Sequence, residues 1–416
     1  MTAKYLTEMW AVLGPALGNH LWQSTLCAGI VGVLTLVLRE NHARTRYWVW
    51  LAGSLKFLIP FSLLISVGSH MAWTRIPAET DARLYAAMTE VGQPFTQSKV
   101  PMNSGILSST ASLSMIHVLS ATLAGVWVSG FIIVLSFWYL RWRKISAAIC
   151  QAVPLREGRE VEALRRMEHI GGTRGRIEVL RSSASLGPGI FGIVRPILLW
   201  PEGISKHLEA AHLEAIVAHE VWHVRRRDNL AAALHMLIEA VFWFYPLVWW
   251  LGARLVEERE RACDEAVLEL GGERQVYAES ILKTCEFCVE FPLACASGVT
   301  GADLKKRIVH IMSPRKAHRL NFSKKFLLSM FASGAIAAPM MFGLLHAAPG
   351  PGETQAENSV GTSRLAAPFQ ASLVEPDRTA TLTRPKAGPR TTKVCAKTLA
   401  ARKAAASLQS NSGKGH

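Results

Sequence analysis

The sequence predicts a mainly α-helical membrane protein in which four transmembrane helices accompany a mixed α+β domain outside the bilayer. Three observations support this fold class. The chain of 416 residues is 50% hydrophobic and contains 13 tryptophans, and its mean hydropathy is +0.20. Four stretches approach the length of about 20 apolar residues that a helix needs to cross a bilayer. A long, more polar stretch between the third and the fourth carries both helix-like and strand-like patterns.

Three of these apolar stretches lie within residues 1–140, which we expect to form an N-terminal membrane region. The predicted spans cover residues 17–38, 47–67 and 114–140, and the fourth covers residues 326–345. The second span contains Lys56 and is expected to kink at Pro60, because proline cannot donate the backbone hydrogen bond of a continuous helix. Residues 70–110 are polar and contain several prolines, so we expect an exposed loop there.

Basic residues cluster at one side of the predicted membrane region. The clusters fall at residues 39–46, 141–144 and 315–325. Because cytoplasmic loops of membrane proteins are enriched in Lys and Arg, we expect these ends of the spans to face the cytoplasm. Residues 141–325 then form a cytoplasmic domain, whereas the N-terminus and the loop at 70–110 are extracytoplasmic.

The last residues, 346–416, are rich in proline, alanine, threonine, serine and basic side chains. They contain few large apolar side chains and cannot bury a core, so we expect a disordered extracytoplasmic tail. The formal net charge of the chain is +15, which we attribute to basic residues that orient the protein in the bilayer and meet lipid headgroups. The sequence contains no basic helix or DNA-reading module, so we expect no direct contact with nucleic acid.

Hydrophobic patterns within residues 141–325 predict helices and a few short strands. Aliphatic runs separated by glycine and proline predict strands or a hairpin between residues 176 and 200. An apolar stripe predicts a helix that begins near Ser205 and continues beyond residue 219. Further helices are expected at residues 160–169, 228–243, 249–270 and 275–290.

The most informative motif lies on the helix that begins near Ser205. His219 and His223 are four residues apart, so both imidazoles lie on one helix face and can bind the same metal ion. Glu220 lies between them, where its carboxylate can take a proton from a water molecule. This combination is typical of a zinc hydrolase.

A third ligand decides the class of zinc hydrolase. In metzincins the motif continues with a glycine and a third histidine, but those positions are Arg226 and Asn229 here, which excludes that class. The alternative is a glutamate on a later helix, and Glu260 supplies it, with Asp264 one helical turn further on. Glu257 is a rival ligand, because a small change of register would bring it to the same place.

We therefore predict a gluzincin, a zinc peptidase with two histidine ligands and one glutamate ligand. Its Zn²⁺ ion is bound by His219, His223 and Glu260, with Glu220 as the general base. Asp264 is expected to orient His219 by a hydrogen bond from outside the metal site. No side chain that stabilises an oxyanion can be assigned from the sequence.

Residues 236–252 are strongly apolar and lie between the two halves of this predicted metal site. A single membrane crossing would separate Glu260 from His219 by about 30 Å, whereas metal coordination requires about 2 Å. The segment must therefore enter the bilayer and return, lie at the interface, or form a buried core helix. We expect it to hold the active site close to the membrane surface.

Other sequence features carry weaker signals. The seven cysteines do not suggest a disulfide framework, and we expect mostly reduced thiols. Cys285 and Cys288 form a CxxC motif, for which helix packing is a simpler interpretation than a second metal site, since no matching pair follows. Asp228 and the three arginines before it are interpreted as a charge cluster at a helix end.

Taken together, these motifs resemble the BlaR/MecR family of membrane metallopeptidases over roughly residues 15–345. The resemblance rests on His20-Leu21-Trp22-Gln23, Arg46-Tyr47, Gly192 with Pro196, the motif at 219–223 followed by Arg226-Arg227-Asp228, the aromatic run at 243–250, and Glu260 with Asp264. The family implies a protein of the bacterial inner membrane whose gluzincin domain faces the cytoplasm. It also implies that an external signal activates the peptidase, which leads to loss of a DNA-bound repressor.

The sequence departs from the family pattern after the last predicted span. The best-known members carry a penicillin-binding sensor domain there, whereas residues 346–416 are short and contain no SxxK acylation motif. We therefore do not expect beta-lactam sensing through such a domain. The loop at 70–110, the tail, a partner protein or the bilayer would supply the signal instead.

The sequence thus predicts a membrane zinc endopeptidase that cleaves a cytoplasmic transcriptional repressor under the control of a signal. The expected substrate is a winged-helix repressor, and the family alone suggests a homodimer. One alternative is a housekeeping gluzincin that processes membrane or misfolded proteins. Another is a non-catalytic signalling scaffold, against which the intact Glu220 argues, because a structural zinc site needs no general base.

Overall fold

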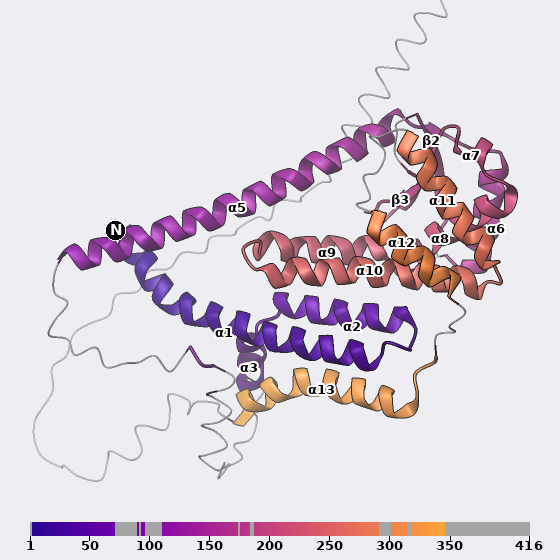
Figure 1. Cartoon of the computed structure of the whole chain (residues 1–416). Helices are drawn as coiled ribbons and strands as arrows, with labels where there is room; N and C mark the ends of the chain where they lie inside the picture. The colour runs from indigo at the N-terminus through magenta and orange to yellow at the C-terminus, as the bar shows by residue number, and fades with distance from the viewer. Residues whose placement is uncertain are drawn as a thin grey trace, which may run out of the picture. The chain divides into compact units, whose positions relative to one another are not determined.

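The computed structural model describes residues 2–70, 90, 93–95, 110–173, 175–183, 187–290, 301–313 and 318–345 (Figure 1). These residues are mostly helical and include one small sheet. The tail predicted at 346–416 and most of the loop predicted at 70–110 lie outside the described residues. Both therefore stay predictions.

Three helices are long and apolar enough to cross a membrane. They are α1 (Thr2–Val37), α5 (Thr110–Gln151) and α13 (Phe322–Leu345), with candidate spans at Leu13–Val37, Val118–Gln151 and Phe322–Leu344. These correspond to the spans predicted at 17–38, 114–140 and 326–345. The helix α5 continues past residue 140 and through the basic cluster at 141–144, because that cluster contains no residue that breaks a helix.

The second predicted span, 47–67, is broken rather than kinked. It consists of α2 (Ala43–Leu55), the short 3₁₀ helix η1 (Lys56–Leu58) and α3 (Phe61–His70), with a bend of 73° between the two parts. Ile59 adopts an extended conformation, with φ −118° and ψ 96°, because Pro60 disfavours the helical conformation of the residue before it. The described residues therefore provide three candidate spans, or four if this bent pair crosses as one.

The helix α3 packs against α13 at two glycines. A Cβ atom on Gly68 would lie 2.1 Å from the carbonyl oxygen of Met340, and one on Gly343 would lie 1.9 Å from that of Ile65. Small residues at a crossing let two helix backbones approach closely, which favours association of helices in lipid. The broken second segment is thus held against the last candidate span.

A small mixed sheet follows α5. Its strands are β1 (Val153–Pro154), β2 (Glu178–Ser182), β3 (Gly189–Phe191) and β4 (Ile197–Pro201), in the order β1-β2-β4-β3. The central strands β2 and β4 are parallel, and each outer strand is antiparallel to its neighbour. The strands predicted between 176 and 200 are confirmed, and β3 forms one edge of the sheet.

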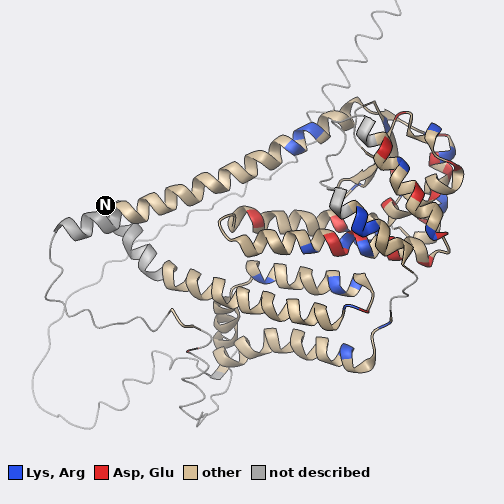
Figure 2. Ribbon diagram, viewed as in Figure 1, with Lys and Arg blue, Asp and Glu red and all other residues tan. Residues whose placement is uncertain are grey.

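One hydrophobic core, to which Val267 of a sixth helix also contributes, is surrounded by this sheet and five helices. They are α6 (Arg159–Gly171), α7 (Ile204–His207), α8 (Ala210–Arg226), α11 (Arg274–Glu290) and α12 (Gly301–Met312). Leu164, Leu198 and Val217 are fully buried in this core. The helix predicted from Ser205 is interrupted, because Leu208 is extended and α8 begins only at Ala210. Charged side chains gather in this part of the molecule and are sparse along α1 and α13 (Figure 2).

The apolar segment 236–252 belongs to a helical hairpin formed by α9 (Asp228–Val241) and α10 (Pro246–Glu269) (Figure 1). The turn of the hairpin contacts α1 within its candidate span. The ring of Phe242 lies 5.7 Å from that of His20, and the hydroxyl of Tyr245 is hydrogen-bonded to that of Thr25. The segment therefore turns back, which leaves both halves of the predicted metal site at the same end of the hairpin.

Buried side chains of this hairpin share a second hydrophobic core with α1 and α2. Its members include Ala28, Val31, Tyr47, Trp50, Ile238, Val248 and Leu251. The hairpin is thus packed among the candidate membrane helices on one side. Trp249 and Trp250 are exposed at the edge of this core, where they can meet lipid headgroups or acyl chains, and the Trp250 ring lies 5.1 Å from that of the buried Trp50.

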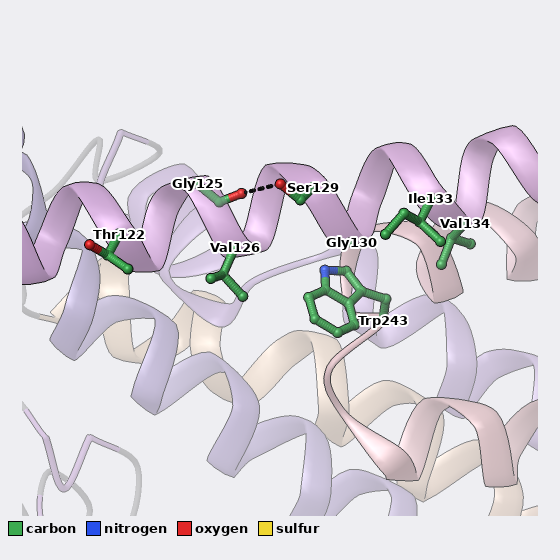
Figure 3. A pocket seen from close by; sticks show the side chains of 8 residues that line it. All are labelled: Thr122, Gly125, Val126, Ser129, Gly130, Ile133, Val134 and Trp243. Carbon is green, nitrogen blue, oxygen red and sulfur yellow. Dashed lines mark hydrogen bonds between the residues drawn. The ribbon is translucent and has the colours of Figure 1, made fainter.

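The long helix α5 contacts the turn of the hairpin through two tryptophans. Trp127 Nε1 donates a hydrogen bond of 3.0 Å to the carbonyl oxygen of Val241, and Trp243 Nε1 donates one of 3.1 Å to that of Trp127. A Cβ atom on Gly130 would lie 2.1 Å from the Trp243 ring, so this contact requires glycine. Figure 3 shows the Trp243 indole beside α5, where it lines an apolar groove of about 540 Å³.

Candidate metal centre

The helix α8 directs both histidines of the motif at one point. His219 and His223 are one helical turn apart, and their Nε2 atoms lie 3.2 Å from each other. His219 is buried and His223 is partly buried. Two imidazole nitrogens that face each other so closely suit a shared cation.

The helix α10 brings a carboxylate to the same point. Glu260 Oε2 lies 3.3 Å from His219 Nε2, and Glu260 Oε1 lies 3.9 Å from His223 Nε2. The ligand atoms of the three residues all lie within 4.8 Å of one another. Glu257, the rival in the sequence, pairs instead with Arg254 and Arg261 at 2.7 and 2.6 Å.

Asp264 and Tyr277 contact the outer nitrogen of His219. Asp264 Oδ1 lies 3.4 Å from His219 Nδ1, and the hydroxyl of Tyr277 lies 3.0 Å from the same nitrogen. Tyr277 also donates a hydrogen bond of 2.6 Å to Asp264. These contacts fix the ring so that its other nitrogen, Nε2, faces Glu260. The sequence indicated Asp264 but gave no signal for Tyr277, which lies on α11.

Asp228 holds the outer nitrogen of His223, as Asp264 and Tyr277 hold that of His219. Its Oδ2 atom accepts a hydrogen bond of 2.8 Å from His223 Nδ1. Arg227, just before it, has a positive φ of 57°, and this tight connection between α8 and α9 turns Asp228 back toward the motif. The sequence analysis interpreted Asp228 as part of a charge cluster at a helix end. Its place five residues after His223 was the signal that could have revealed its role.

Arg307 on α12 lies beside the same cluster. Its Nε and Nη2 atoms donate to the two carboxylate oxygens of Asp264 at 2.9 and 2.7 Å, and its Nη1 lies 3.5 Å from Glu260 Oε2. The guanidinium group therefore compensates a carboxylate that has no exposed surface. Arg307 lies 43 residues beyond Asp264, and no spacing rule in the sequence points to it.

The charges around the histidines favour a cation at this point. Burial alone would raise the pKa of Asp264, but Arg307 and His219 outweigh it and hold that pKa at about 2. Burial and Arg307 act to lower the pKa of His219, yet hydrogen bonds with Asp264 and Glu260 raise it to about 9. A site that stabilises a proton on a buried histidine so strongly also suits a metal ion. The donor set of two imidazoles and one carboxylate matches catalytic zinc sites.

Glu220 lies on α8 beside the edge strand β3. Its Oε2 atom accepts a hydrogen bond of 3.2 Å from the backbone N–H of Ile190. The side chain of Asn229 donates to the carbonyl oxygens of Ile190 and Gly192 at 3.1 and 3.0 Å, which ties the same strand to α9. The Ile190 N–H thus holds one oxygen of the Glu220 carboxylate, and Asn229 holds the strand that provides this N–H.

A second group of residues that could bind a metal shares His223 with the first group. His223, Asp228 and Cys263 also have ligand atoms within 4.8 Å of one another. Because Asp228 and Cys263 contact the Nδ1 side of His223, they support the same ring rather than form a separate site. Within the described residues, neither candidate metal group contains Cys285 of the CxxC motif.

The cysteines only partly follow the sequence-based expectation. Cys27, Cys263 and Cys285 carry free thiols, whereas Cys150 is disulfide-bonded. The expectation of mostly reduced thiols holds for Cys27, Cys263 and Cys285, and Cys150 at the end of α5 is the exception.

Comparison with known proteins now identifies the family. Residues 17–311 match the family model described as BlaR1 peptidase M56. The chain belongs to this family. The match covers α1 to α12 and includes every residue of the candidate metal centre, which confirms the resemblance found in the sequence.

Two relatives illustrate how far the similarity to the BlaR1 peptidase M56 family extends. The chain is 31% identical over 163 residues to the regulatory protein BlaR1 of Bacillus licheniformis, which is 38% of this chain and 27% of that protein. It is 28% identical over 109 residues to the methicillin resistance mecR1 protein of Staphylococcus aureus (strain Mu50 / ATCC 700699), which is 26% of this chain and 19% of that protein. The chain thus matches less than a third of the length of these relatives.

The BlaR1 peptidase M56 family is a family of metallopeptidases, and two features of this chain agree with it. The three candidate spans agree with a membrane protein, and the cluster of His219, His223 and Glu260 agrees with a metal site.

Proposed function

We propose that this protein is a zinc-dependent membrane endopeptidase of the gluzincin type, with its active site at the cytoplasmic face of the bacterial inner membrane. One observation carries the proposal. The histidines of α8 and Glu260 of α10, separated by a hairpin that turns among the candidate spans, converge on one partly buried point. Asp264 and Asp228 orient the two histidines, as carboxylates outside the metal's ligand set do in zinc enzymes.

Peptide hydrolysis at this site requires a metal ion and a base. Zn²⁺ bound by His219, His223 and Glu260 would act as a Lewis acid and lower the pKa of a bound water toward about 7. Glu220 takes the proton of the attacking water and passes it to the leaving amine. The Ile190 N–H orients the Glu220 carboxylate for both transfers. The buried surroundings of His219 keep bulk water away from the reacting groups.

The charge pattern supports the cytoplasmic orientation. Arg39, Arg44 and Arg46 follow the first candidate span, and basic residues at 141–144 end the hydrophobic part of α5. Basic loops of membrane proteins remain in the cytoplasm, so the domain between α5 and α13 faces that side. The hairpin then enters the bilayer from the cytoplasm, and anionic lipid headgroups are neighbours of the site.

The relatives suggest the kind of substrate. Their names describe a regulatory protein and a methicillin resistance protein. We infer that this chain acts in signal-controlled proteolysis of a cytoplasmic winged-helix repressor, and that it works as a homodimer as the family suggests. In this scheme the peptidase itself does not bind DNA.

The Glu220→Gln variant tests the proposal. It should retain metal, because Glu220 is not one of the proposed ligands, but lose at least about 1,000-fold in proteolysis, as expected for a residue that serves as both base and acid. The measurement compares new protein N-termini in cells that carry the wild type or the variant. Cleaved repressor fragments that depend on Glu220 support regulation, and fragments of diverse membrane proteins support the housekeeping alternative.

Glu214→Gln is the matched control for this experiment. Glu214 lies on the same helix and pairs only with the exposed Arg166, so its loss should leave proteolysis unchanged. If Glu220→Gln and wild-type cells yield the same N-termini and the same signalling, the chain is a scaffold and the proposed activity is wrong.

A further inference from the structure

The start of α2 holds α10 on the face opposite the candidate metal ligands. Arg46 Nε donates a hydrogen bond of 2.9 Å to Glu258 Oε2, and both side chains are buried, with 7% and 8% of their surface exposed. Glu258 and Glu260 are two residues apart, which separates their directions by about 200° around a helix axis. The ion pair and the candidate ligand therefore lie on opposite sides of one helical turn.

A second contact repeats this arrangement two turns further along α10. The backbone N–H of Ala43 donates a hydrogen bond of 2.8 Å to Glu265 Oε2, and His42 Nδ1 lies 3.6 Å from the same oxygen. Glu258 and Glu265 are seven residues apart, so they share one face of the helix. The segment at 42–46 thus contacts α10 at two positions along this face, two helical turns apart (Figure 1).

Arg46 is itself fixed by backbone oxygens. Its Nη1 atom donates to the carbonyl oxygen of Arg39 at 3.2 Å and to that of Asn41. A planar guanidinium group with partners at both ends keeps little rotational freedom. The Oε2 atom of Glu258 therefore meets a rigid partner, whereas its Oε1 atom pairs with the partly exposed Arg261 at 3.2 Å.

Asn41 ties the same loop to the last candidate span. Its Nδ2 atom donates to the carbonyl oxygens of His318 and Arg319 at 3.1 and 3.3 Å, and its Oδ1 atom accepts a hydrogen bond of 2.8 Å from Lys324 Nζ. Asn41 is buried, with 3% of its surface exposed. Polar contacts thus continue from the start of α13 through Asn41 and Arg46 to Glu258.

We propose that Arg46 is a positioning residue of the metal centre, which sets the rotation and height at which α10 presents Glu260 to His219 and His223. The inference rests on the proposed function, since it concerns the same metal site, and it deepens that function. A displacement of α13 or of the loop between α1 and α2 would reach Glu260 through this ion pair. The ion pair is the point at which a signal from the membrane region alters metal coordination.

Co²⁺ binding to the full-length protein in lipid nanodiscs tests this inference without a peptide substrate. The visible spectrum of bound Co²⁺ reports the coordination geometry, and competition with a chelator gives its affinity. Arg46→Gln and Glu258→Gln should each weaken binding about tenfold, a typical effect of a group that orients ligands from outside. Each should also change the cobalt spectrum. The double variant should lose no more than either single one, because the two residues act as a unit.

Glu214→Gln is the matched control, because Glu214 is a partly exposed carboxylate on α8 that pairs with the exposed Arg166, away from α10. It should bind Co²⁺ as the wild type does. Arg46→Lys serves if Arg46→Gln does not fold, since lysine keeps the charge but loses the fork that contacts both Glu258 and the backbone. Its expected result is the same altered spectrum.

Two results overturn the inference. If the folded Arg46 variant binds Co²⁺ with the affinity and spectrum of Glu214→Gln, the ion pair is only a structural link, even if the melting temperature falls. Losses that add in the double variant show that the two residues act separately. If the wild type binds Co²⁺ no better than His219→Ala, the proposed metal site itself fails, which is a distinct outcome.

Discussion

At the scale of single residues, the candidate metal centre depends on the side chains that hold the outer nitrogens of the two histidines. His219 is held by Asp264 and Tyr277, and His223 is held by Asp228. The sequence indicated Asp264 because it lies one turn from Glu260. It did not indicate Asp228, because three arginines beside it suggested an ordinary charged helix end, and only the turn at Arg227 directs it to the motif.

The Asp228→Asn variant should weaken metal binding by about 10- to 100-fold, as expected when a partner of a ligating histidine is lost. Asparagine keeps the shape of the side chain but removes the charge that makes His223 a better ligand. Chelator competition with Zn²⁺ on the purified protein measures the effect.

Glu214→Gln again provides the control, since it removes a partly exposed carboxylate from the same helix. Equal zinc affinities in the two variants would show that Asp228 does not support His223.

At the scale of elements, the hairpin of α9 and α10 is the feature that makes the site possible. The apolar segment 236–252 could enter the bilayer and return, lie at the interface or form a buried core helix. Hydropathy alone does not distinguish these three arrangements. The structure shows a hairpin because the turn at 242–245 packs on α1 and because Trp127 and Trp243 join it to α5 by reciprocal hydrogen bonds. The element that carries Glu260 is thus held by two candidate spans.

Gly130→Ala should destabilise the protein, because the new methyl group would overlap the Trp243 ring at 2.1 Å. Overpacking of this kind typically costs about 1–3 kcal/mol, which a lower melting temperature would register.

The control is Gly125→Ala on the same helix, where a Cβ atom would meet no other atom within 4 Å. Alanine there should leave the melting temperature unchanged or raise it slightly, since alanine favours a helix more than glycine does. A Gly130→Ala protein as stable as Gly125→Ala would mean that α5 is not packed on the hairpin.

At the scale of the whole molecule, a bound metal would join two hydrophobic cores. The helix α8 belongs to the core around the small sheet, whereas the first half of α10 belongs to the core shared with α1 and α2. Ligands from both helices meet at one point. Metal binding should therefore stabilise the packing of the core around the sheet against the core shared with α1 and α2, as well as the local site.

Removal of the metal with a chelator should lower the melting temperature of the full-length protein. A ligand at 100 times its dissociation constant stabilises the folded state by about 2.7 kcal/mol, and that contribution is lost on chelation. Tryptophan fluorescence during heating measures the change.

The His219→Ala variant should show no further response to chelator, because it lacks one proposed ligand. A wild-type melting temperature that is insensitive to chelator, while metal analysis shows complete removal, would contradict a role of the metal in joining the two cores.

The sequence by itself determined the helical membrane class, three of the spans, the strands near 176–200 and the residues His219, Glu220, His223 and Glu260 as candidates. These features depend on local composition and on helical periodicity, which are readable along the chain. Only the tertiary structure decided the break at Pro60, the hairpin at 236–252 and the neighbours Asp228, Tyr277, Arg307 and Arg46. Contacts between residues so distant in sequence depend on how the helices pack, and no local pattern encodes them.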